Sequence, residues 1–239
     1  MAIEHPLNFT HEQMTPDETL TRKPLKTPRA AAIAGLVFSC LLAVAFALLR
    51  ISVPAHPQES GAWLHTSSAA VALAMNLIPF AGVAFLWFIG VLRDRLGQRE
   101  DRFFATVFFG SGLLFLGTLF LASAVGGGIL MGFAAKPEEF IGSPTFYFAR
   151  AVVYATMNVY VVKMAAVFMI STSTIALYTA IAPRWLAILG YVLAVLLLLG
   201  SSYISWSFLV FPAWVFMVSV SILLETFGQT KSRAQSPAK

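Results

Sequence analysis

Six long apolar runs constrain this chain more than any other feature of its sequence. They cover approximately residues 30–49, 67–92, 103–125, 146–182, 183–200 and 206–224. A helix needs about 20 predominantly apolar residues to cross the ~30 Å hydrocarbon core of a bilayer. Backbone groups in hydrocarbon must bond to one another, so runs of this kind form helices. The sequence therefore predicts an all-α fold, an integral membrane bundle of six transmembrane helices.

The low charge content points to the same class. Charged residues make up 11% of the 239 positions, against about 25% in soluble domains. A soluble fold of this length needs more charge on its surface, so lipid must cover much of this one. We expect one transmembrane domain over residues 30–227. It is flanked by disordered cytoplasmic tails at 1–29, which is polar and proline-containing, and at 228–239.

The distribution of Lys and Arg predicts the orientation, because cytoplasmic segments of membrane proteins carry an excess of both. With a cytoplasmic N-terminus, 12 of the 16 Lys and Arg residues fall in cytoplasmic segments, whereas Arg50, Lys136 and Arg150 fall outside. The twelve are Arg22, Lys23, Lys26, Arg29, Arg93, Arg95, Arg99, Arg102, Arg184, Lys231, Arg233 and Lys239. Six spans then place both termini in the cytoplasm.

The sequence contains no readable catalytic motif, and none for a metal or cofactor. Its one cysteine, Cys40, lies inside the first apolar run, and none of its four histidines lies near the middle of a run. A haem held by two histidines within the bundle is therefore excluded. The net charge of +5 is explained by basic residues at the ends of the runs, so we expect no nucleic-acid partner.

Lys163, an ionisable residue, lies well inside the fourth apolar run and is the strongest candidate for a functional residue. Such residues are costly in the membrane and are often functional. Two placements remain open. The ammonium is deep in the membrane if the fourth span is centred near residue 163. It reaches the outer boundary by snorkelling if that span begins near Tyr160.

A polar stripe surrounds Lys163 at helical spacing. We define the polar stripe as Thr156, Tyr160, Lys163, Ser171, Thr174 and Tyr178, with Val167 in the same series. The 4-3-4-4-3-4 spacing predicts that these residues share one face of a helix. That face either packs against other helices through hydrogen bonds or forms one wall of a polar path or ligand pocket.

Two prolines predict kinks in the second and sixth runs. Pro79 leaves the carbonyl of Met75 without its helical donor, and Pro212 does the same to the carbonyl of Phe208. Asn76 lies three residues before Pro79. Kinks beside polar groups either line binding sites or serve packing alone, and the sequence leaves both interpretations open.

Three segments resemble a group of polytopic, six-span bacterial membrane proteins of unknown function. They are RDRLGQREDRFFATVFFGSGLLFL at 93–116, KMAAVFMISTSTIALYTAIAPRWLAILGY at 163–191 and FPAWVFMVSVSILL at 211–224. The resemblance implies no activity. It implies a multi-pass protein of the bacterial cytoplasmic membrane, which in Gram-negative cells is the inner membrane.

These observations favour a non-enzymatic function, as an accessory or assembly subunit or as a lipid-interacting membrane protein. The expected partners are the lipid bilayer and either another membrane subunit or further copies of this chain. The first alternative is a transporter or channel component for a small solute or anion, which uses the polar stripe around Lys163. The second is a lipid-modifying enzyme, for which Glu138 and Glu139, in the outer loop between the third and fourth runs, are the candidate polar residues.

Overall fold

The computed structural model describes residues 27–56, 58–96, 102–179, 182–200 and 207–235, and every regular element in these ranges is helical. The predicted all-α class is therefore confirmed. The main helices are α1 (Thr27–Ser52), α2 (Leu64–Leu96), α3 (Arg102–Ala135), α5 (Pro144–Ala155), α6 (Val162–Thr179), α7 (Arg184–Gly200) and α8 (Ser207–Gln235). Short elements are the 3-10 turn η1 (Gly61–Trp63), α4 (Pro137–Phe140) and the π-helical turn η3 (Thr156–Val161), which joins α5 to α6.

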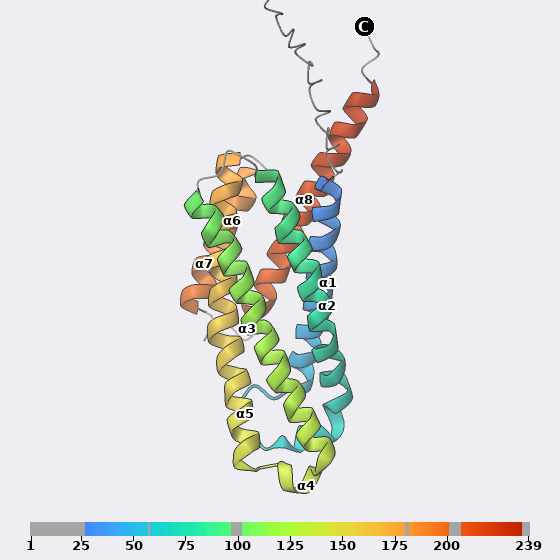
Figure 1. The fold of residues 1–239 in the computed structure, drawn as a ribbon, viewed down its shortest axis with the longest axis vertical. Helices are drawn as coiled ribbons and strands as arrows, with labels where there is room; N and C mark the ends of the chain where they lie inside the picture. The colour runs from blue at the N-terminus through green and yellow to red at the C-terminus, as the bar shows by residue number, and fades with distance from the viewer. Residues whose placement is uncertain (1–26, 57, 97–101, 180–181, 201–206, 236–239) are drawn as a thin grey trace, which may run out of the picture.

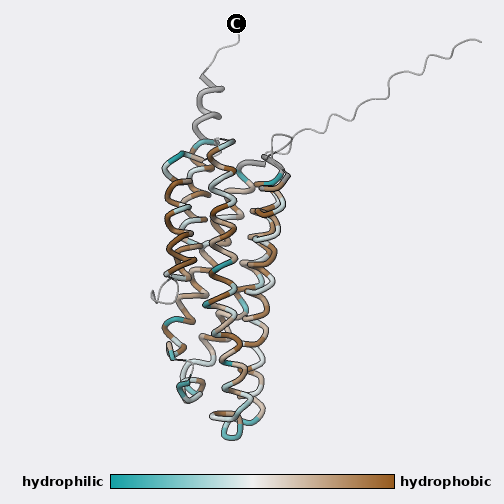
Figure 2. The backbone as a smooth tube through the Cα atoms, turned by 90° about the vertical axis from the view of Figure 1, so that its left-hand side faces the viewer, coloured by the Kyte–Doolittle hydropathy of each residue, from teal (hydrophilic) through white to brown (hydrophobic). Residues whose placement is uncertain are grey.

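The described chain contains five helical segments that are long and apolar enough to cross a membrane, and α7 is a sixth, shorter apolar helix. They run up and down the bundle in turn, so that α1 begins and α8 ends at the same end (Figure 1). Most hydrophobic positions lie along the shafts of these helices, and hydrophilic ones gather toward the two ends (Figure 2). The six helices correspond to the six predicted runs.

The helix ends differ from the predicted boundaries in three places. The third run was expected to end near residue 125, but α3 continues through the glycines at 126–128 to Ala135. Gly126 is buried against Met75, and a Cβ atom there would meet the Met75 sulfur at 2.9 Å. This close helix contact offsets the low helix propensity of glycine. In addition, α1 begins at Thr27, within the predicted tail, and α8 continues to Gln235, beyond the predicted boundary at residue 227.

The lengths of the helices are unequal. At 1.5 Å per residue, the 33 residues of α2 and the 34 residues of α3 extend for about 50 Å. Helix α7 has 17 residues and a length of about 25 Å. The last turn of α7 and the first turn of α8 therefore lie part-way along their longer neighbours (Figure 1). Beyond that level, α1, α2, α3 and α5 continue without them.

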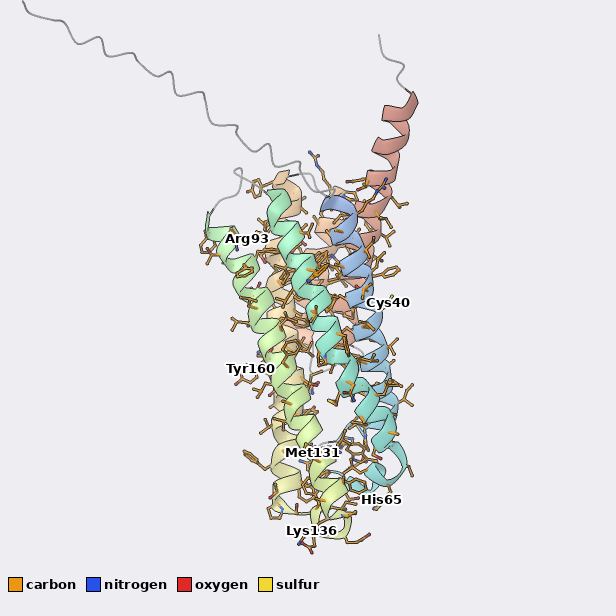
Figure 3. The ribbon with its side chains drawn as sticks, turned by 45° about the vertical axis from the view of Figure 1, so that its right-hand side comes forward. Cys40, His65, Arg93, Met131, Lys136 and Tyr160 are labelled. Atoms are coloured by element: carbon orange, nitrogen blue, oxygen red, sulfur yellow. The ribbon has the colours of Figure 1, made fainter. Side chains whose placement is uncertain are left out.

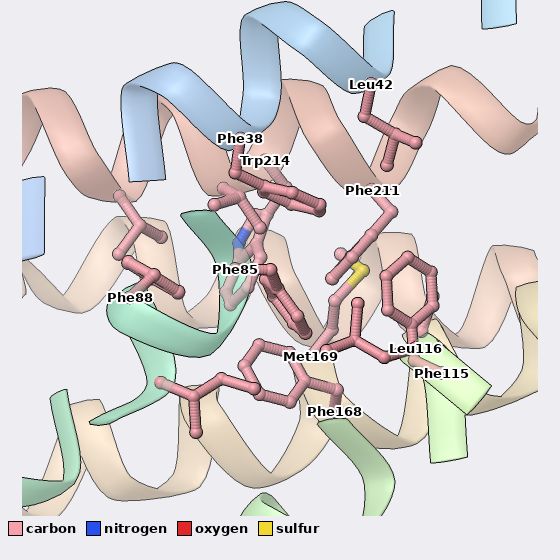
Figure 4. Packing of buried hydrophobic residues seen from close by; sticks show 14 of the residues in the cluster. Phe38, Leu42, Phe85, Phe88, Phe115, Leu116, Phe168, Met169, Phe211 and Trp214 are labelled. Carbon is pink, nitrogen blue, oxygen red and sulfur yellow. The ribbon is translucent and has the colours of Figure 1, made fainter. Parts of the chain in front are cut away.

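Aromatic side chains from five helices meet in the core where all six helices are present (Figure 4). The members are Phe38 of α1, Phe85 of α2, Phe115 of α3, Phe168 of α6 and Phe211 of α8. The Phe85 ring lies 4.5–5.8 Å from the other four ring centroids. Aromatic pairs at these distances add stabilisation beyond their buried area. Phe211 contacts the other four rings at 4.7–5.9 Å, so Phe85 and Phe211 together couple the five helices.

Helix α7 is attached to this core through close contacts and hydrogen bonds. Gly190 packs directly against the Ser173 hydroxyl of α6 and the Trp214 indole of α8. The Trp214 Nε1–H group donates to the carbonyl of Leu186 at 3.4 Å. Gly190 and Ala194 are both buried, which agrees with the close helix approach that this small-residue pair predicts.

We predict that Phe85→Ala destabilises the protein strongly, because it removes a central ring of the aromatic cluster. Core Phe→Ala substitutions lower the free energy of unfolding by about 3–5 kcal/mol in soluble proteins. In a membrane protein, lipid rather than water surrounds the separated helices, so we expect a loss no larger than this. Thermal unfolding of the detergent-solubilised protein measures the effect. Phe80→Ala, on the 67% exposed side chain of the same helix, is the control and should change the melting temperature little.

Candidate functional site

The structure separates the polar stripe into two sets. Thr156, Ser171 and Thr174 are buried in the bundle, whereas Tyr160, Lys163 and Tyr178 are exposed. A π-helical turn at Thr156–Val161 contains more residues per turn than an α-helix, so it rotates the residues that follow relative to α5. Tyr160 accordingly points away from the bundle (Figure 3). The stripe does not line one common path.

The buried stripe residues make hydrogen bonds within and between helices. Ser171 Oγ donates to the Val167 carbonyl and Thr174 Oγ1 to the Ile170 carbonyl, both within α6. The Thr174 hydroxyl also lies 2.6 Å from the Tyr191 hydroxyl of α7. Bonds of this kind fix neighbouring membrane helices to one another. This arrangement favours the packing interpretation of the buried set.

The kink residues also connect helices. Asn76 and Pro79 are exposed, and the Asn76 side chain donates to the Ala72 carbonyl of its own helix. Pro79 leaves the Met75 carbonyl without a helical donor, and the Ser123 hydroxyl of α3 donates to that carbonyl at 3.3 Å. Pro212 is buried in α8, one turn from Phe208. Met75, Ser123 and Phe208 all line the cavity described next.

A cavity of about 360 Å³ lies between the long helices, next to the first turn of α8. Its volume is within the range of about 300–1,000 Å³ that is typical of ligand sites. Residues of α1, η1, α2, α3, α5, η3 and α8 line it, together with the loop that follows α1. Most of its wall is apolar, and the lining includes Arg50 and Arg150. We refer to it as the arginine cavity. Lys163 is not among its lining residues.

The arginine cavity follows from the unequal helix lengths. Phe208 of α8 lines it, and beyond that level the bundle continues with α1, α2, α3 and α5. Close helix packing connects α1 to α2, α2 to α3, and α3 to α5. Helices α1 and α5 are not among the closely packed pairs. Tyr154 and Val159 line the cavity while 46% and 40% exposed, so it reaches the surface of the bundle beside α5 and η3.

Arg150 connects α5 to the loop after α1. The local fold places it well, because Ser143 caps α5 by accepting from the Phe146 amide, and Gly142 supplies the positive φ of 75° in the preceding turn. Arg150 Nη2 donates to the carbonyls of Pro54 at 3.0 Å and His56 at 2.7 Å. These bonds bridge α1 and α5 on the side where the two helices do not pack closely.

The guanidinium of Arg150 is almost fully buried, with 6% of the residue exposed. Its Cζ atom lies 5.5 Å from the centre of the Trp63 ring, a cation–π distance. Two buried donors at this position, Nη1 of Arg150 and Nε1 of Trp63, have no hydrogen-bond partner among the described residues. No carboxylate in the described ranges lies within ion-pair distance of Arg150. This end of the cavity therefore carries a positive charge without a direct ion-pair partner among the described residues, together with two N–H groups that lack acceptors there.

Comparison with protein families, curated proteins and solved structures found no match. Function must therefore be argued from the site alone. In the described ranges, no three His, Cys, Asp or Glu side chains come together in a manner that would hold a metal ion. Glu138 and Glu139 are exposed, and Glu139 pairs with Lys136 at 2.8 Å on the surface of the bundle. They do not gather with other polar groups around a shared pocket.

The pairing of Arg150 with Pro54 and His56 is not evident in the sequence. The charge distribution places Arg50 and Arg150 in the outer segments and indicates nothing more about them. Arg150 nevertheless lies inside the fourth apolar run, and an arginine in such a run is as notable as Lys163. Its partners are backbone carbonyls 94 and 96 positions away, and no side-chain pattern identifies a backbone acceptor.

We predict that Arg150→Ala destabilises the protein by about 1.5–3 kcal/mol, the range for hydrogen bonds to charged groups. The substitution leaves two loop carbonyls without their donor and releases the loop from α5. Lys163→Ala is the comparison, since the Lys163 side chain is exposed and does not line the arginine cavity. Thermal unfolding in detergent should show a clear loss for Arg150→Ala and almost none for Lys163→Ala. Equal losses would contradict the assignment.

Proposed function

We propose that this chain is a non-enzymatic, lipid-interacting protein of the cytoplasmic membrane, which holds a lipid-like molecule in the arginine cavity. The observation that carries the proposal is a large, mainly apolar cavity that opens beside exposed helix surface and ends at a buried arginine. An apolar wall favours acyl chains, and an opening toward the bundle surface gives them access from the bilayer. An accessory or assembly role in a larger membrane complex is compatible with this function.

The proposed orientation is N-in and C-in. It is supported by the excess of Lys and Arg around the start of α1, around the α2–α3 connection and toward the end of α8. Arg93 lies toward the end of the bundle where α1 begins, and Lys136 and His65 lie at the opposite end (Figure 3). In this orientation the arginine cavity lies in the outer half of the molecule.

The alternatives receive less support from the described residues. A transporter that uses the polar stripe needs a cavity that reaches Lys163, and the arginine cavity does not include it. A lipid-modifying enzyme that uses Glu138 and Glu139 needs further polar groups nearby, whereas Glu139 pairs with Lys136 on the surface. We therefore carry neither alternative further.

We predict that a cysteine at position 138 reacts with a membrane-impermeant maleimide added to intact cells, whereas one at position 93 reacts only after the cells are opened. Both variants should carry Cys40→Ala, so that the introduced thiol is the one labelled. The result follows from the predicted outer location of the α3–α5 connection. Labelling of position 93 in intact cells would contradict the proposed orientation.

We predict that filling the arginine cavity removes a tightly held lipid. Ala122 lines the cavity and is 2% exposed, so Ala122→Phe should occupy the space of an acyl chain. Ala124, two residues along the same helix, is exposed, and Ala124→Phe is the matched control. Mass spectrometry of lipids retained after mild detergent extraction should show a loss for Ala122→Phe alone.

A second variant separates loss of binding from loss of folding. Leu130 is a half-buried lining residue, and Leu130→Trp enlarges a side chain that is already large, with less disturbance of the helix packing. Lipid loss in both cavity variants, with unchanged elution as a single species, supports the proposal. If the wild-type protein retains no lipid, or if the cavity variants retain as much as the control, the proposed function is wrong.

A further inference from the structure

The molecule in the arginine cavity must satisfy an unusual set of groups. The guanidinium stays protonated at every accessible pH. Its two bonded acceptors, the Pro54 and His56 carbonyls, supply partial negative charge but no net charge. A buried charge without a counter-charge is strongly unfavourable. The site therefore needs an additional negative group at the Nη1 side of Arg150.

A second donor lies on a separate element beside the first. The Trp63 ring, which belongs to η1, lies against the Arg150 guanidinium, and its Nε1–H group is buried with no acceptor among the described residues. Two N–H donors and a positive charge match an anionic oxygen group, because charge-assisted bonds to phosphate or carboxylate are the strongest that arginine forms. Water would satisfy the donors but would leave the charge uncompensated.

The rest of the lining determines the net charge of the ligand. Arg50 lies in the last turn of α1 and adds a second positive side chain, and the lining residues include no Asp or Glu. Glu59, which acts electrostatically on Arg150, is exposed and does not line the cavity. The arginines would therefore repel the ammonium of a zwitterionic headgroup, and no lining carboxylate would attract it. An anionic headgroup would be attracted by both arginines.

The apolar part of the cavity continues from the arginines toward α8. Phe46, Met75, Ile78 and Phe208 line it without presenting a charged group. A free inorganic anion would leave this apolar volume without a matching group. An acyl chain attached to the anionic head would fill it.

We propose that the arginine cavity is a selective site for an anionic amphiphile, whose phosphate or carboxylate bonds to Arg150 and Trp63 while its chain lies along the apolar wall toward Phe208. This inference rests on the proposed lipid-binding function and specifies the chemical class of the ligand. It also assigns Arg150 and Trp63 as residues that determine specificity.

The test measures lipid binding to the purified full-length protein by native mass spectrometry. Phosphatidylglycerol and oleate are the anionic probes, phosphatidylethanolamine is the zwitterionic probe, and inorganic phosphate is the probe without a chain. The wild-type protein should bind at least one anionic amphiphile about tenfold or more tightly than phosphatidylethanolamine, the factor expected from a charge-assisted hydrogen bond. A preference for phosphatidylglycerol or for oleate identifies the phosphate or the carboxylate source.

Two substitutions test the assigned residues. Arg150→Gln keeps a polar side chain but removes the charge, and it should abolish the anionic preference, while Arg150→Lys should restore part of it. Trp63→Phe keeps the ring and removes the N–H donor, so anionic affinity should fall several-fold while zwitterionic affinity is unchanged. If either residue had a merely structural role, its substitution would lower the affinity for anionic and zwitterionic lipids equally.

The outcomes that overturn this inference differ from those that overturn the proposed function. Equal binding of phosphatidylglycerol, oleate and phosphatidylethanolamine to wild type, still sensitive to Ala122→Phe, would leave a lipid site but refute anion selectivity. Inorganic phosphate binding as tightly as the amphiphiles would refute the role of the chain. Binding of no amphiphile at all would refute the proposed function itself.

Discussion

The inequality of helix lengths is the constraint on which the rest of this structure depends. Helix α7 extends for about half the length of α2 and α3, and α8 begins at the level where α7 ends. On the side of that level where α1 begins and α8 ends, all six helices are present, and Phe85 and its neighbouring rings lie in their core. Beyond that level, toward the α3–α5 connection, the bundle continues with α1, α2, α3 and α5. The arginine cavity lies among these helices, and Phe208 in the first turn of α8 lines it. The cavity is therefore a consequence of topology rather than of poor packing.

Arg150 compensates structurally for the absence of close packing between α1 and α5. Its two bonds to loop carbonyls connect the helices beside the cavity, and its Nη1 group is a buried donor without a partner among the described residues. The Nη2 group of this guanidinium thus holds the loop, and its Nη1 group is the donor that we assign to the ligand. Trp63 supports both, since its ring contacts the cation and its N–H group is the second donor.

The sequence was sufficient to predict the helices because hydrocarbon imposes a simple rule on the backbone, and long apolar runs reveal where it applies. It was insufficient to predict which faces point inward. Spacing placed Lys163 and Ser171 on one stripe, but the two residues are about 80° apart around α6. The buried surface of α6 includes Ser171 and leaves Lys163 outside. The site was missed for a related reason: Arg150 bonds to backbone carbonyls, and Met75 to Ser123, through contacts between distant helices that no periodicity encodes.

The most direct test of this account is an experimental density map of the protein purified with lipids from its native membrane. The account predicts elongated density in the arginine cavity, with its head within hydrogen-bonding distance of Arg150 Nη1 and Trp63 Nε1 and its tail directed toward Phe208. Density that shows only water in the cavity, or side chains that have closed it, would contradict the account.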